Sequence, residues 1–110
     1  MRLLLNLNDM TKDKYKKIVL TWGYVALLMI QEDLLQYEKY EYCKPIQDAF
    51  YELETMIDFK YPRKLSDVNI EDYKQNFWRL GLSGDIAVSN LYSYTRNAWD
   101  YLMKDNHKET

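Results

Sequence analysis

The sequence predicts an all-α protein, a compact bundle of about four helices that forms a single helical domain over residues 1–110. Glycine and proline are scarce, three and two in the chain, whereas a fold of many short strands needs more turn residues than that. Apolar residues also recur every three or four positions, the spacing that places them on one side of a helix. A chain of this length can bury a core without disulfides or metals.

The first helix is expected over residues 12–37, after a short extended lead-in, with Asn8, Asp9 or Thr11 as its N-cap. Residues 18–30 read IVLTWGYVALLMI and are apolar on two adjoining faces, which is typical of a helix at the centre of a bundle. These thirteen residues are too few to cross a membrane, which needs roughly 18–20. Gly23 lies inside the run, where we expect it to let a neighbouring helix approach closely.

The second helix is expected over residues 42–59 and has the clearest pattern in the chain. Its apolar residues fall at i, i+3, i+4, i+7, i+10 and i+11: Ile46, Ala49, Phe50, Leu53, Met56 and Ile57. This spacing predicts one buried face, with Asp48 and Glu52 on the opposite side. Pro45 fits a first helical turn because its missing N–H is not needed there, so the helix should begin between Tyr40 and Pro45.

Two further helices are expected over residues 70–80 and 84–104. Asn69 is the expected cap of the earlier helix, and Ser83 that of the later one. Gly81 suits the C-terminal end of the earlier helix. Its expected apolar face consists of Ile70, Tyr73, Phe77 and Leu80, and the later helix carries a wider face that includes Ala87, Val88, Leu91, Tyr92, Tyr94, Ala98, Trp99, Tyr101 and Leu102.

The join at residues 78–90, WRLGLSGDIAVSN, has the outline of a DNA-binding helix-turn-helix. That motif needs a small residue four positions before the glycine, and this chain has Phe77 there. The helix after the join begins near Asp85 and has no basic residue before Arg96, although phosphate contacts supply most non-specific affinity for DNA. The sequence therefore favours an ordinary capped connection and argues against direct nucleic-acid binding by this segment.

Charge is unevenly distributed, although the formal net charge is only −2. Residues 31–58 carry eight carboxylates against two lysines, and basic clusters at residues 12–17 and 60–64 flank this acidic middle. In one alternative, these two clusters are the contact surface of a nucleic-acid-binding regulator. Such clusters more commonly form a solvent-exposed surface without a binding role.

No catalytic, cofactor-binding or metal site is expected. His107 is the sole histidine and lies near the C-terminal end, so it cannot form a serine–histidine or cysteine–histidine pair on a rigid element. Cys43 is the sole cysteine, which excludes an intramolecular disulfide and a cysteine–histidine zinc cluster. With one cysteine and no signal-peptide pattern at its N-terminus, the chain is expected in the reducing cytoplasm.

Tyrosine is unusually frequent, with eleven in the chain. Tyrosines commonly fill the edge of a core with their hydroxyls in water, but they also anchor protein interfaces because a rigid ring gives contact area at low entropic cost. Several lie beside the carboxylates of the acidic middle, where they would suit a basic protein partner, such as one that itself handles nucleic acid. The expected partner-binding residues are Tyr37, Tyr40, Glu41, Asp48, Tyr51 and Glu52.

The segment YEYCKPIQDAFYEL, residues 40–53, resembles the second helix of the UVR hairpin motif of nucleotide-excision-repair proteins. Lys44 and Gln47 differ from the small and basic residues of that motif, and Pro45 has no counterpart in it. The resemblance covers less than a quarter of the chain and implies a helical hairpin used for contact between proteins, not a repair activity. The matching residues are Tyr40, Glu41, Cys43, Ile46, Asp48, Phe50 and Leu53.

These observations predict a non-catalytic protein-binding module, an inhibitor or modulator of a larger complex of the kind found among phage and mobile-element proteins. Its contact surface is expected on the acidic, tyrosine-rich second helix and the turn before it. Two alternatives stay open: the nucleic-acid-binding regulator, which would use residues 12–17 and 60–64, and a self-associating structural subunit whose aromatic face closes a homodimer. No membrane association is expected.

Overall fold

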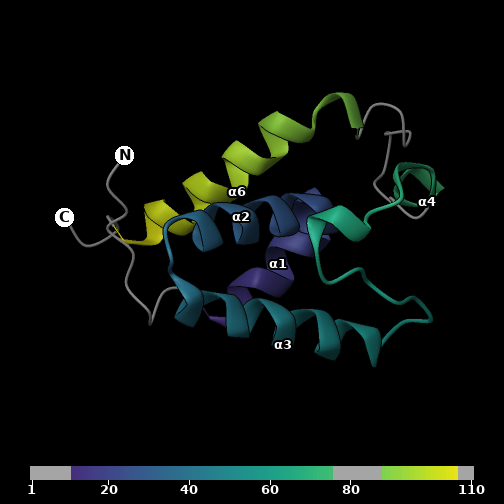
Figure 1. Ribbon diagram of the computed structural model, residues 1–110, viewed down its shortest axis with the longest axis horizontal. Coiled ribbons are helices and arrows are strands. Elements are labelled where there is room, and N and C mark those ends of the chain that lie inside the picture. The colour runs from purple at the N-terminus through teal and green to yellow at the C-terminus, as the bar shows by residue number, and fades with distance from the viewer. Residues whose placement is uncertain (1–10, 76–87, 107–110) are drawn as a thin grey trace.

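The computed structural model describes residues 11–75 and 88–106 and shows an all-α bundle (Figure 1). No strand occurs within these residues. The α-helices described are α1 (Lys12–Trp22), α2 (Tyr24–Gln36), α3 (Cys43–Glu54), α4 (Ile70–Gln75) and α6 (Leu91–Asn106), and the 3-10 helices are η2 (Tyr40–Tyr42) and η3 (Leu65–Asp67). The predicted lead-in, the caps at Asn8, Asp9 and Ser83, and the join around Gly81 lie outside the described residues.

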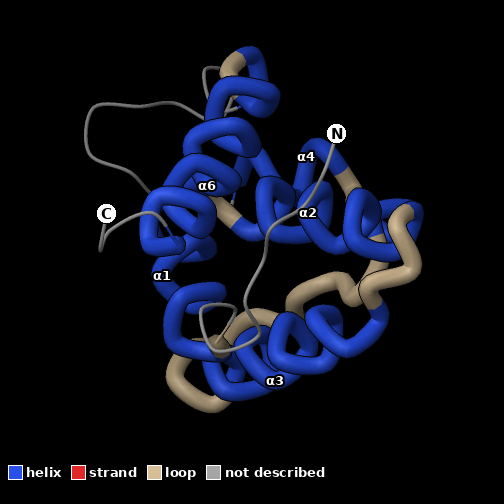
Figure 2. Tube along the Cα trace, turned by 90° about the vertical axis from the view of Figure 1, so that its left-hand side faces the viewer, coloured by secondary structure: helices blue, strands red, loops and turns tan. Residues whose placement is uncertain are grey.

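Helix α2 lies at the centre of the bundle. It has buried residues around most of its circumference, namely Tyr24, Val25, Ala26, Leu27, Leu28, Ile30, Gln31 and Leu34. Helix α1 packs against α2, α3 and α6. Helices α6 and α3 lie on opposite sides of the α1 and α2 pair (Figures 1 and 2). The prediction of a buried central helix is therefore confirmed for the second half of the apolar run.

Gly23 interrupts the helix that was predicted over residues 12–37 and divides it into α1 and α2. Its backbone has φ 94° and ψ 160°, a conformation that is essentially restricted to glycine. The Gly23 N–H still donates to the carbonyl of Val19 at 2.9 Å and so closes α1. The prediction of one continuous helix was wrong. Leu20, which the sequence placed on an apolar face of this helix, is 72% exposed.

Helix α3 begins where the sequence predicted and ends earlier. It starts at Cys43, within the expected window, and its buried residues are Ile46, Ala49, Phe50 and Leu53. It ends at Glu54 because Thr55 caps it: the Thr55 hydroxyl donates to the carbonyl of Glu52 at 2.6 Å. Met56 and Ile57, which the periodicity placed in the core, lie beyond this end and are 69% and 49% exposed.

Side-chain caps begin two of the helices as predicted. Thr11 accepts a hydrogen bond from the N–H of Lys14 at 3.3 Å at the start of α1. Asn69 Oδ1 accepts one from the N–H of Asp72 at 2.9 Å at the start of α4. In α4 Tyr73 is buried as expected, whereas Ile70 is 42% exposed.

The last helix, expected over residues 84–104, is interrupted at residue 90 and ends two residues later than expected, while its predicted start at residue 84 lies outside the described residues. Residues 88 and 89 are helical, residue 90 is in a turn, and α6 then runs from Leu91 to Asn106. Its buried residues include Ala98 and Leu102, which the sequence placed on the apolar face.

A small polar network fixes the loop between α3 and η3. Arg63 donates two hydrogen bonds to Glu54, from Nη1 to Oε2 at 2.6 Å and from Nη2 to Oε1 at 2.9 Å. The N–H of Tyr61 donates to the same carboxylate at 2.6 Å. Gln31 Nε2 donates to the carbonyl of Arg63 at 3.0 Å, and Gln47 Nε2 donates to Gln31 Oε1 at 2.7 Å. The network joins the loop to α2 and α3.

Candidate partner-binding surface

The outward side of α3 and the 3-10 helix before it carry most of the residues predicted to bind a partner. Helical spacing places them opposite the buried face of α3. Tyr51 is 68% exposed and Tyr40 is 60% exposed. We call this the α3 surface, made up of Tyr40, Glu41, Lys44, Asp48, Tyr51, Glu52 and Thr55.

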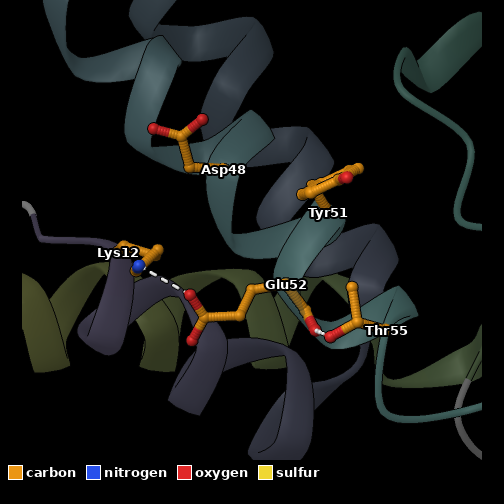
Figure 3. A pocket seen from close by; sticks show the side chains of 5 residues that line it. All are labelled: Lys12, Asp48, Tyr51, Glu52 and Thr55. Carbon is orange, nitrogen blue, oxygen red and sulfur yellow. Dashed lines mark hydrogen bonds and ion pairs between the residues drawn. The ribbon is translucent and has the colours of Figure 1, made fainter.

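A shallow pocket of about 280 Å³ lies in the α3 surface, close to the start of α1. It is lined by Lys12, Asp48, Tyr51, Glu52 and Thr55 (Figure 3). In the close-up view Lys12 reaches across from α1 toward Glu52, while Asp48 and Tyr51 project from successive turns of α3. Its volume of about 280 Å³ is close to the lower limit of roughly 300 Å³ for small-molecule sites, and it is large enough to take in one side chain of a partner.

Glu52 is bound within the chain. Lys12 Nζ lies 2.6 Å from Oε2 of Glu52, and Lys16 Nζ pairs with Oε1. The hydrogen bonds from Lys12 and then Lys16 lower the pKa of Glu52 to about 2. Both oxygens of this carboxylate are therefore occupied by α1, and Glu52 forms the wall of the pocket rather than an open charge.

Asp48 and Glu41 are the carboxylates of the α3 surface that stay accessible. Asp48 pairs with Lys44 one turn earlier at 3.3 Å, and half of the Asp48 side chain is exposed. Such an exposed i,i+4 pair contributes little, and an incoming cation can replace it. Glu41 is exposed in η2.

The structure separates Tyr37 from the other predicted residues. Tyr37 is the C-terminal cap of α2, and it lines a second and larger concavity, a groove of about 750 Å³ between α2 and α6. Met29, Trp99 and Met103 also line this groove, which we call the α2–α6 groove. Trp99 Nε1 donates a hydrogen bond to Asp33 Oδ2 at 3.2 Å across it.

Sequence reasoning gave the last helix a wide apolar face and left open a homodimer closed by an aromatic face, but it did not predict a groove between this helix and α2. Trp99 is half-buried, but Tyr92 on the same helix is 81% exposed. The available signal was the wide apolar face of that helix, which exceeds the width that one neighbouring helix covers.

The basic clusters at residues 12–17 and 60–64 are partly neutralised inside the fold. Lys12 and Lys16 pair with Glu52, and Arg63 pairs with Glu54. These pairs reduce the number of cations that either cluster presents to a phosphate backbone.

The single cysteine sits at the start of α3 and is half-buried. Cys43 Sγ donates to the carbonyl of Lys39 at 3.8 Å, and burial raises the pKa of the thiol. A raised pKa disfavours the reactive thiolate, so the arrangement suits packing and not nucleophilic chemistry.

Comparison of the chain with protein-family models, curated proteins and solved structures found no match. In the described part of the chain no helix is both long and apolar enough to span a bilayer. The same residues contain no group of three or more histidine, cysteine, aspartate or glutamate side chains that could hold a metal ion.

Proposed function

We propose that this protein is a non-catalytic protein-binding module that contacts its partner through the α3 surface. The observation that carries the proposal is the position of Tyr51, whose side chain is 68% exposed beside Asp48 and a pocket. The opposite face of the same helix is buried, so the ring is presented by a rigid element. Rigid aromatic residues next to pockets are the common anchors of protein interfaces.

The chemistry of the α3 surface suits a basic segment of the partner. An arginine or lysine side chain can pair with Asp48 and lie over the ring of Tyr51 in a cation–π contact. The Lys12–Glu52 pair at the edge of the pocket disfavours a second basic residue of the partner at that position, because Lys12 would repel it. We propose that the chain works in the cytoplasm as an inhibitor or modulator of a larger complex, as small proteins of phages and mobile elements do.

Affinity capture with the immobilised full-length chain tests this proposal. Asp48→Lys and Tyr51→Ala should each reduce the amount of captured partner about tenfold, since interface anchors contribute more than about 1 kcal/mol. Asp67→Lys, the same charge change at an exposed residue of η3, is the matched control and should capture as much as the wild-type chain. Circular dichroism should show the same helix content for all variants.

Two outcomes would overturn the proposal. One is undiminished capture by both Asp48→Lys and Tyr51→Ala. The other is a complex with DNA or RNA in an electrophoretic mobility-shift assay at moderate salt. That result would favour a nucleic-acid-binding regulator that acts through residues 12–17 and 60–64.

A further inference from the structure

The α2–α6 groove is a second concave surface, and it shares no residue with the α3 surface. Helices α2 and α6 run parallel, because contacts join successive residues of each in the same order. Thr95 Oγ1 lies 3.3 Å from Met29 Sδ, and one turn further on Trp99 Nε1 lies 3.2 Å from Asp33 Oδ2. The resulting groove has a volume of about 750 Å³, and Tyr92, which lines it, is 81% exposed.

The spacing of the α6 residues in the groove indicates what occupies it. Tyr92, Trp99 and Met103 line the groove together with Arg96, at positions i, i+7, i+11 and i+4. This alternation of four and three is the repeat by which one helix packs against another. The groove is therefore suited to bind a further helix that packs along α6.

Arg96 and Asp100 give the groove one positive and one negative side chain, so that the grooves of two copies can pair through opposite charges. Both line the groove and are exposed, and in the described part of the chain neither forms an ion pair within 4.0 Å. A base four positions before an acid is also the weaker order for a pair within one helix. The two charges are therefore available to a neighbouring molecule.

We propose that a second copy of this chain docks in the groove, with its α6 antiparallel to the first. A two-fold axis that passes between the two α6 helices, at the level of residue 98, lies midway between positions 96 and 100. It places Arg96 of each copy beside Asp100 of the other, so that two ion pairs form. The same axis brings Tyr92 of each copy to within about one helical residue, roughly 1.5 Å, of the level of Met103 in the other.

The two-fold arrangement leaves the α3 surface open. Helices α6 and α3 lie on opposite sides of α2 (Figure 1), so a dimer formed through α6 presents two α3 surfaces. Such a dimer would bind a repetitive or dimeric partner with avidity. The inference does not depend on the proposed function, because the dimer can be measured without the partner.

Charge reversal with analytical ultracentrifugation tests the proposal. The wild-type chain should sediment as a dimer. Arg96→Asp and Asp100→Arg should each raise the dimer dissociation constant about tenfold or more, because like charges then meet twice across the axis. The double variant Arg96→Asp/Asp100→Arg should restore the dimer, and Asp48→Arg on the α3 surface should leave it unchanged.

An equimolar mixture of the two single variants gives the sharpest result. One copy then carries two acids at these positions and the other carries two bases, so the mixture should form heterodimers more tightly than either variant alone forms homodimers. A wild-type chain that is monomeric, single variants that dimerise like the wild type, or a double variant that stays monomeric would each overturn the antiparallel arrangement. Capture of a different protein or a small molecule in the groove of a monomeric chain would do the same.

Discussion

Two carboxylates of α3, Glu52 and Glu54, join this helix to the elements beside it. Glu52 binds Lys12 and Lys16 of α1, and Glu54 binds Arg63 of the following loop. The two differ in exposure: 36% of the Glu52 side chain is accessible, against 10% of Glu54. Because solvent screens an exposed pair, Glu54 should contribute more to stability than its neighbour.

Replacement of Glu54 by glutamine should lower the free energy of unfolding by about 2 kcal/mol, the usual range for a hydrogen bond to a charged group. The change removes the charge that holds Arg63 and weakens the acceptor of the Tyr61 N–H. Urea unfolding followed by circular dichroism measures the effect. Asp48→Asn, which removes an exposed i,i+4 pair, is the control and should change little; equal losses in both variants would contradict the account.

Acid should destabilise the protein partly through Glu52. The neighbouring lysines lower its pKa from 4.5 to about 2 in the folded chain. A carboxylate whose pKa is lower in the folded state stabilises the fold above the unfolded pKa and loses this contribution as the pH falls. The urea midpoint should therefore drop between about pH 4.5 and pH 2, and Glu52→Gln should make that drop shallower. An unchanged pH profile in the variant would show that the pair is not formed.

At the scale of elements, Gly23 decides whether the N-terminal third of the chain is one helix or two. A continuous helix would gain about 1 kcal/mol from Gly23→Ala. The observed backbone, with φ 94°, would instead strain alanine by about 1–3 kcal/mol. We predict a loss of stability in thermal or urea unfolding. Any gain would mean that α1 and α2 are continuous, so the sign of the change is enough to decide.

The starts of α1, α3 and α4 were easier to predict than the end of α3 or the break at Gly23. Pro45 and the caps Thr11 and Asn69 have direct physical signatures, and all of them fall where expected. Met56 and Ile57 continue the apolar periodicity of α3 past its actual end, so the pattern alone could not reveal the stop at Thr55. Likewise, a glycine inside an apolar run is compatible both with a close helix contact and with a break.

At the scale of the whole molecule, α3 and α6, the helices that contribute to the two candidate surfaces, lie on opposite sides of α2 (Figures 1 and 2). Periodicity within one helix was enough to bring Asp48, Tyr51 and Glu52 together. It could not place Lys12 in the same pocket, because that contact depends on how α1 packs against α3. It also could not show that Tyr37 lies in the α2–α6 groove, since the chain reverses direction between α2 and α3.

The most direct test of the central claim is a calorimetric titration of the captured partner into the wild-type chain and into two variants at Tyr51. We predict that Tyr51→Ala raises the dissociation constant about tenfold or more, since an anchoring ring contributes over about 1 kcal/mol. Tyr51→Phe, which keeps the ring, should stay within about threefold of the wild type. Equal affinity of the wild type and Tyr51→Ala would contradict the claim that this protein binds its partner through the α3 surface.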